Sequence, residues 1–241
     1  MKKVLGCIRR ADKDWNMITH GDSIAIDVSG GKDSMLMLHA LSLYRMFSHV
    51  DYRIHAVTLD MGMDGFDSSP IAEYADKLNI PFTLVKTGIY DEVFIKHGGK
   101  NPCSLCARMR RGILHKTAKK LGCSKVALAH SSDDVIETLL LGVFQESRMH
   151  VFRPVTYLDR SDLTLIRPLV YLSEQHIKKT VARLGLPIVH NPCPANGHTR
   201  RQDMKELLNK LSATIPDCRE RLLGALKNDE AYCLWNRTHE E

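Results

Sequence analysis

Hydrophobic and polar positions alternate along the chain as short apolar runs followed by longer amphipathic segments. The first run, 22–28, ends at a glycine turn and predicts a buried strand. Similar runs and the segments between them predict strands at 53–59, 81–86, 125–129 and 163–166, and helices at 33–47, 70–78, 104–121 and 133–144. Strands separated by helices indicate an α/β fold, a parallel sheet with helices on both faces. Ligands of such sheets bind beyond the carboxyl ends of the strands.

The pattern changes after residue 153. Helices are predicted at 173–184, 201–211 and 216–226, whereas 187–197 is rich in Pro, Asn and Gly and predicts a loop. We therefore expect an α/β domain over residues 1–170 and a small helical C-terminal region over 171–241.

Composition places the chain among ordinary globular proteins. Of 241 residues, 44% are hydrophobic and 26% charged, which excludes a disordered or collagen-like chain. The sequence contains no apolar run of about 18 residues and no secretory signal, so neither a membrane span nor export is expected. In the reducing cytoplasm, the expected location, the seven cysteines are free thiols or metal ligands rather than disulfides.

The net charge of +6 comes from one segment. No acidic residue lies between Val93 and Ser132, and the rest of the chain has 25 basic against 28 acidic residues. Such a block is typical of a surface that binds a polyanion, here a nucleic acid, although a solvated helix face gives the same pattern. Its nine basic residues are Lys96, Lys100, Arg108, Arg110, Arg111, Lys116, Lys119, Lys120 and Lys125.

A glycine-rich turn connects the first predicted strand to the first predicted helix. Glycines let the backbone approach an anion, and the N–H groups at a helix start point toward it. Neither the P-loop NTPase pattern nor the dinucleotide pattern is present. The turn therefore predicts a phosphate cradle of another kind, formed by Ser29, Gly30, Gly31, Lys32, Asp33 and Ser34.

This turn resembles the pyrophosphate loop of the N-type ATP pyrophosphatase superfamily, whose fold is Rossmann-like and adenine nucleotide alpha hydrolase-like. The resemblance implies that ATP is cleaved between its α and β phosphates and that a substrate is adenylated. It also implies that residues 29–34 hold pyrophosphate and Mg²⁺, with catalytic roles for Lys32 and Asp33. The end of the second strand, Leu59, Asp60 and Met61, is then expected near the adenosine.

A second acidic segment opens the helix predicted at 133–144. Asp133, Asp134 and Glu137 share one side of this helix start, where carboxylates either complement the helix dipole or take part in function. The segment from Ala129 to Thr138 resembles a motif of the tRNA-modifying branch of the superfamily. That resemblance implies that Asp133 positions the substrate or magnesium.

Two cysteines, Cys103 and Cys106, stand at the start of the basic helix. The helix N-terminus and the nearby arginines are expected to favour their thiolates. A single Cys-x-x-Cys fits a redox pair, half a zinc site or part of an iron–sulfur site. Cys193 lies in the late loop, where His190 or His198 would complete a zinc site. Apolar surroundings suggest that the other late or helical cysteines are buried hydrophobes, namely Cys123, Cys218 and Cys233.

The Cys-x-x-Cys, the arginines that follow it and the lone Cys193 before Arg200-Arg201-Gln202 resemble the tRNA 2-thiocytidine synthetase family. The resemblance implies that Cys103, Cys106 and Cys193 hold a 4Fe-4S cluster whose fourth iron takes a sulfide, and that Arg110 reaches the ATP phosphates. The implied reaction adenylates the C2 carbonyl of an anticodon-loop cytidine and replaces its oxygen with sulfur. Expected partners are tRNA, a sulfur donor such as a cysteine desulfurase or free sulfide, and a second copy in a homodimer, with no membrane.

Other interpretations remain open from the sequence. A tRNA 2-thiouridine synthetase, or another adenylating enzyme such as tRNA lysidine synthetase, shares the glycine loop. A non-catalytic RNA-binding module with structural zinc fits the charge pattern. A disulfide oxidoreductase fits the Cys-x-x-Cys but leaves the glycine loop unexplained.

Overall fold

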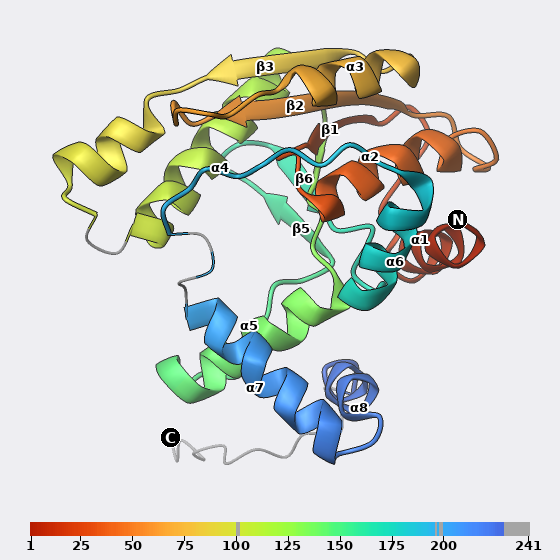
Figure 1. Cartoon of the computed structure of the whole chain (residues 1–241). Helices are drawn as coiled ribbons and strands as arrows, with labels where there is room; N and C mark the ends of the chain where they lie inside the picture. Colours follow the sequence, from red (N-terminus) through yellow and green to blue (C-terminus); the bar gives the residue numbers. More distant parts are fainter. Residues whose placement is uncertain (100–101, 196, 198–199, 229–241) are drawn as a thin grey trace, which may run out of the picture. The chain divides into compact units, whose positions relative to one another are not determined.

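The computed structural model describes residues 1–99, 102–195, 197 and 200–228 (Figure 1). The chain forms two compact units, one of residues 1–132 and 152–199, the other of residues 133–151 and those from 200 onward. This division differs from the boundary at residue 170 expected from the sequence. The reason is helix packing: α6 (Glu174–Leu184) packs on α2 (Lys32–Tyr44), and α5 (Ser132–Glu146) packs on α7 (Arg200–Thr214).

The first unit is built on a six-stranded sheet with the order β3-β2-β1-β4-β6-β5 in the described part of the chain. All neighbouring strands are parallel except β5, an edge strand antiparallel to β6. The α/β class with a parallel sheet is therefore confirmed, whereas β5 was not expected. The strands are β1 (Ser23–Asp27), β2 (Arg53–Asp60), β3 (Phe82–Lys86), β4 (Lys125–Ala127), β5 (Val155–Leu158) and β6 (Leu163–Ile166).

Helices cover both faces of the sheet (Figure 1). Leu114 and Ala118 of α4 (Pro102–Lys120) pack on one face, against Ala25, Val57 and other residues of β1, β2, β4 and β6. Ile24 and Ile26 alternate with Ala25 and so point to the other face, where α2 packs on β1. Two further helices of this unit are α1 (Lys2–Trp15), which packs on α2, and α3 (Ser69–Lys77).

Strand order identifies where a ligand binds. β1 has β2 on one side and β4 on the other, so the chain changes direction across the sheet at this strand. In open α/β sheets, ligands bind at such a switch point, outside the carboxyl ends of the strands. The glycine loop leaves β1 at that end, one residue after Asp27.

The second unit is helical, as expected for the C-terminal part. Its apolar core joins Ile136 and Leu140 of α5 to Met204 and Leu208 of α7, with partly buried leucines of α8 (Cys218–Ala225) packed against it.

The helix α1 was not predicted, although its signal was present. Val4, Ile8 and Ala11 recur at helical spacing and are fully buried. A short π-helix, Asp91–Lys96, also precedes α4. Among the described residues, no helix combines the length and the hydropathy needed to cross a membrane.

Candidate functional site

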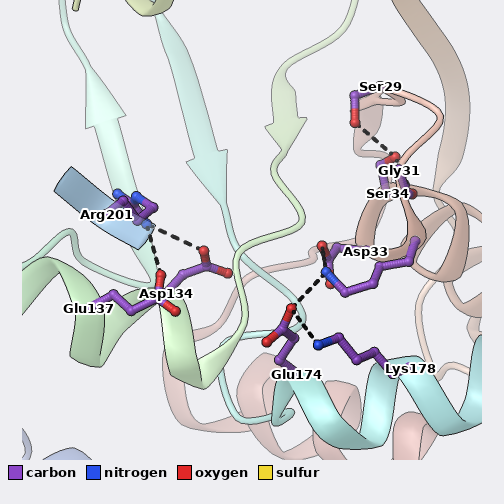
Figure 2. A network of polar contacts seen from close by, with 10 residues as sticks. Ser29, Gly31, Asp33, Ser34, Asp134, Glu137, Glu174, Lys178 and Arg201 are labelled. Atoms are coloured by element: carbon purple, nitrogen blue, oxygen red, sulfur yellow. Dashed lines mark hydrogen bonds and ion pairs between the residues drawn. The ribbon is translucent and has the colours of Figure 1, made fainter. Parts of the chain in front are cut away.

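The glycine loop has the conformation that an anion cradle requires. Gly30 has φ +80°, and a Cβ at this position would lie 2.7 Å from the Cβ of Val189. Gly31 caps α2 with an extended backbone, and the Ser34 hydroxyl donates to its carbonyl over 2.9 Å. The Ser29 hydroxyl lies 3.2 Å from that of Ser34 (Figure 2). The first N–H groups of α2 therefore open onto this loop.

A segment from far along the sequence supports the loop. The Val189 N–H donates to the Gly30 carbonyl over 3.0 Å. This contact explains why only glycine fits at position 30, and it places the segment before Cys193 directly on the loop.

Lys32, the only lysine of the loop, is held by two carboxylates. Its Nζ lies 2.9 Å from Asp33 Oδ2 and 3.0 Å from Glu174 Oε1, at the start of α6 (Figure 2). Burial alone would lower the pKa of Lys32, but the charges and hydrogen bonds of Asp33 and Glu174 outweigh it and raise that pKa. Lys32 is therefore a firmly charged ammonium at the cradle.

A pocket adjoins the loop at Ser29. Leu59 and Met61, which were expected near the adenosine, line this pocket, and their adenosine role stays a prediction. Asp60 is not among the lining residues; its carboxylate accepts the Gly62 N–H over 2.9 Å and shapes the bend after β2. Arg110 of α4 lines it too. Among the described residues, the lining consists of Ser29, Leu59, Met61, Met63, Phe66, Arg110, Asn191 and Pro192.

Sequence reasoning missed Asp27. This carboxylate ends β1 and lies 3.6 Å from the Arg110 guanidinium. Burial raises the pKa of Asp27, and the positive charge of Arg110 opposes that rise. The signal was an acidic residue inside a hydrophobic strand, next to the glycine turn.

The three cysteines of the expected cluster lie near one another in the first unit. The segment after α6 runs past the start of α2 toward the N-terminal end of α4, which carries Cys103 and Cys106 (Figure 1). Burial raises the pKa of Cys106; Arg110 opposes this, and the nearby Cys193 and Cys103 add to it. The expectation that the helix start favours a Cys106 thiolate is therefore wrong, because burial outweighs Arg110.

Two of these cysteines, Cys106 and Cys193, are next to residues that line the pocket. The Cys106 thiol donates to the sulfur of Met61 over 3.7 Å, and Met61 lines the pocket. Cys193 follows the lining residues Asn191 and Pro192, and its N–H donates to the Asn191 side chain over 3.1 Å. The pocket is therefore lined both by Ser29 of the glycine loop and by residues adjacent to Cys106 and Cys193.

The donor set fits an iron–sulfur cluster. Three soft thiol ligands suit such a cluster. In the described ranges, no group of three His, Cys, Asp or Glu side chains is placed to hold a metal ion. For the zinc interpretation, His190 is exposed and His198 lies outside the described residues.

The other cysteines behave as expected where they are described. Cys123 and Cys218 are buried, and Cys7 is half-buried. Cys233 lies outside the described residues.

The basic segment is only partly a surface. Lys125 is buried and pairs with Asp22 over 2.7 Å, so it is a structural ion pair and not part of a docking face as its inclusion in the basic block suggested. Lys119 pairs with Asp162, and Lys100 lies outside the described residues. The exposed basic side chains of α4 include Arg108, Arg111, Lys116 and Lys120.

The acidic motif opens α5 in the second unit. Asp133 is buried, and its Oδ1 accepts from Arg219 Nε of α8 over 2.9 Å. Arg219 also donates to the side chains of Asn209 and Ser212. The carboxylate proposed to position substrate is therefore bound by an arginine of the same unit.

Arg201 of α7 binds the other two carboxylates of the motif. It lies 3.3 Å from Asp134 and 3.9 Å from Glu137 (Figure 2). Burial raises the pKa of Glu137 to about 7; the charge of Asp134 adds to this effect, whereas Arg201 opposes it.

Comparison with known proteins agrees with the sequence motifs. A family model described as PP-loop domain matches residues 7–211. The tRNA-cytidine(32) 2-sulfurtransferase of Geobacter sulfurreducens is 40% identical over 230 residues, 94% of this chain and 90% of that protein. The protein of that name from Pelobacter propionicus is 39% identical over 230 residues, 94% of this chain and 86% of its own.

A solved structure shares the fold. The U34-tRNA thiolase NcsA from Methanococcus maripaludis, solved with its 4Fe-4S cluster, gives a TM-score of 0.76 at 19% identity, covering 94% of this chain and 77% of that chain. Together with the glycine loop on β1, these matches show that the chain belongs to the PP-loop domain family and, within it, to the family of the tRNA-cytidine(32) 2-sulfurtransferases.

Proposed function

We propose that this protein is an ATP-dependent tRNA sulfurtransferase that converts an anticodon-loop cytidine to 2-thiocytidine. One observation carries the proposal: Ser29 of the glycine loop lines the same pocket as Met61, which contacts Cys106, and as the two residues before Cys193. Phosphate chemistry and sulfur chemistry therefore meet at one place.

Activation of the base is the first step. The C2 carbonyl oxygen of cytidine attacks the α phosphorus of ATP, the bond from that phosphorus to the β-phosphate bridge breaks, and pyrophosphate leaves. The loop N–H groups and the Lys32 ammonium stabilise the charge that develops on the leaving phosphates. Asp33, next to Lys32, would hold Mg²⁺, which would neutralise part of the phosphate charge.

The second step exchanges oxygen for sulfur. Cys103, Cys106 and Cys193 would hold the 4Fe-4S cluster, which would carry a sulfide taken from the donor. Attack of sulfide on C2 forms the C–S bond and breaks the C2–O bond, and AMP departs with that oxygen. Arg110 lines the pocket, and its positive charge opposes the rise in the pKa of Cys106. It stabilises the negative charge of the nucleotide phosphates.

The polyanionic substrate meets the exposed basic face of α4. Arg108, Arg111 and Lys116 provide phosphate contacts, which position an RNA without reading its sequence. The target base must be unstacked to enter the pocket. We assign the sulfur to a donor such as a cysteine desulfurase or free sulfide, the assembly to a homodimer and the location to the cytoplasm, where thiols remain reduced.

Nucleoside mass spectrometry tests this function. The protein is purified and its cluster reconstituted without oxygen, then incubated with unmodified tRNA, ATP, Mg²⁺ and sulfide. We expect 2-thiocytidine and one pyrophosphate for each sulfur transferred. Formation of 2-thiouridine would move the protein to the neighbouring thiouridine branch. Pyrophosphate release without any thiolated nucleoside would indicate another adenylating activity, such as that of tRNA lysidine synthetase.

A further inference from the structure

The lysine of the glycine loop has an acidic contact that no motif marks. Glu174, in the first turn of α6, lies 3.0 Å from the Lys32 ammonium, and its side chain is only 15% exposed (Figure 2). Asp33, the other carboxylate on Lys32, is its neighbour in the loop and moves with it. Glu174 comes from a separate helix and ties the lysine to the body of the first unit.

The structure holds Glu174 firmly in place. Ser173 caps α6, with its hydroxyl accepting the His176 N–H, and Ile177 is fully buried one turn after Glu174. A carboxylate in the first turn is also stabilised by the helix dipole. Lys178, one turn along, lies 3.4 Å from the same Glu174 oxygen. Glu174 is therefore a fixed anchor, because its helix packs on α2 behind the loop.

A fixed anchor matters for a lysine. The ammonium stands on a flexible four-carbon stem and has three N–H donors. Asp33 and Glu174 accept two of them, so the direction of the third is set by the protein before any ligand arrives. Catalytic groups held in advance need no reorganisation when the reaction occurs.

We propose that Glu174 is a positioning residue that aims the Lys32 ammonium at the phosphates of ATP. This inference rests on the proposed function, since it assumes that the loop binds ATP. Glu174 acts through Lys32 and does not touch the nucleotide itself. Its removal therefore weakens nucleotide binding and pyrophosphate release only while Lys32 is present.

Calorimetric binding of the Mg²⁺ complex of α,β-methylene-ATP, which cannot be cleaved between the α and β phosphates, tests this role. The proteins compared are wild type, Glu174→Gln, Lys32→Ala and the double variant. Glu73→Gln, which removes an exposed carboxylate of α3, serves as the matched control. Thermal unfolding of each variant checks that it is folded.

We expect Glu174→Gln to raise the Kd about tenfold and to slow pyrophosphate release as well, while Glu73→Gln equals wild type. In the Lys32→Ala background, Glu174→Gln adds less than about twofold, the coupling expected of residues that act as one unit. Glu174→Asp keeps the charge on a shorter side chain and is expected to weaken binding less; it replaces Glu174→Gln should that variant unfold.

Three results would overturn the inference. Binding by Glu174→Gln equal to wild type leaves no positioning role. Tighter binding by Glu174→Gln would mean that Glu174 competes with phosphate for Lys32. An undiminished effect in the Lys32→Ala background would show that Glu174 acts elsewhere. If wild type itself neither binds the analogue nor releases pyrophosphate, the proposed function fails and this inference fails with it.

Discussion

The two motif regions have opposite electrostatic arrangements. In the first unit one ammonium, Lys32, lies between two carboxylates, whereas in the second unit the carboxylates at the start of α5 are bound by Arg201 and Arg219. The partners from other elements, Glu174 and the two arginines, lie far from the motifs in the sequence. In both regions, contacts with distant segments hold the charged motif side chains in place before a ligand is present. The charged motif groups are already paired: the loop ammonium with two carboxylates, and the acidic motif with two arginines.

The arrangement changes how the acidic motif is understood. Asp133 was expected to position substrate or magnesium, yet it is buried against Arg219. Removal of Arg219 would leave the buried Asp133 charge without this partner, which costs stability. A role of Asp133 toward the substrate remains a prediction.

The largest effect is expected at the loop lysine. Lys32→Ala removes the ammonium that stabilises the leaving pyrophosphate, so kcat/KM for pyrophosphate release falls about 10²- to 10³-fold. Lys179→Ala, which removes an exposed lysine of α6, is the control and retains full activity. If kcat/KM of the Lys32→Ala enzyme stayed within about threefold of wild type, the Lys32 ammonium would not stabilise the leaving pyrophosphate.

The next effect concerns the backbone of the same loop. Gly30→Ala places a methyl group 2.7 Å from the Val189 Cβ at a φ of +80°, where an alanine is strained. We expect the free energy of unfolding to fall by about 2–3 kcal/mol in urea titrations. Gly112→Ala, at an open position in α4, is the control and is expected to be neutral or stabilising. Equal stability of Gly30→Ala and wild type would show that the loop adopts another conformation.

In the second unit the two arginines are expected to differ. Arg219→Ala removes the guanidinium from the buried Asp133 and lowers the free energy of unfolding by about 2 kcal/mol. Arg201 forms a solvent-exposed ion pair, since its side chain is 44% exposed. Arg201→Ala is therefore expected to lower the free energy of unfolding by less than about 1 kcal/mol. Denaturant titrations compare the two variants. The reverse order would mean that Arg201, and not Arg219, supports the motif.

The smallest effect is a pH dependence. Because the pKa of Glu137 is raised to about 7 in the folded protein, the folded state binds this proton more tightly than the unfolded state. The resulting stabilisation is complete below the unfolded pKa and is lost as the pH rises through 7. Between pH 6 and pH 8 we expect a loss of about 1 kcal/mol.

Glu137→Gln should remove this component, because the amide does not titrate. The measurement is the free energy of unfolding of both proteins at several pH values in that range. Parallel curves for wild type and Glu137→Gln would contradict the raised pKa.

Local patterns were sufficient to predict much of the molecule. The spacing of apolar positions and the turn residues indicated the parallel strands. The Gly30-Gly31 turn after a buried strand indicated the phosphate cradle. Both signals could be recognised because each lies within a few neighbouring residues. The amphipathic positions of α1 carried a similar signal that was overlooked.

Contacts between distant segments could not be predicted in this way. Nothing near Glu174 in the sequence shows that its helix packs behind the glycine loop, and nothing near Lys125 shows that it is buried against Asp22. The raised pKa of Cys106 likewise depends on burial, which the sequence around it does not reveal. Charge and motif thus indicated the chemistry, whereas tertiary packing determines how each group is held.

The most direct test of the account measures iron content and thiolation in the Cys193→Ala protein. Cys7→Ala, which removes a half-buried thiol from α1, is the matched control. After reconstitution without oxygen, we expect Cys193→Ala to lose the cluster absorbance and to form no 2-thiocytidine while still binding ATP, and Cys7→Ala to match wild type. A Cys193→Ala protein that keeps its iron and thiolates tRNA would contradict the claim that three distant cysteines join at the nucleotide pocket.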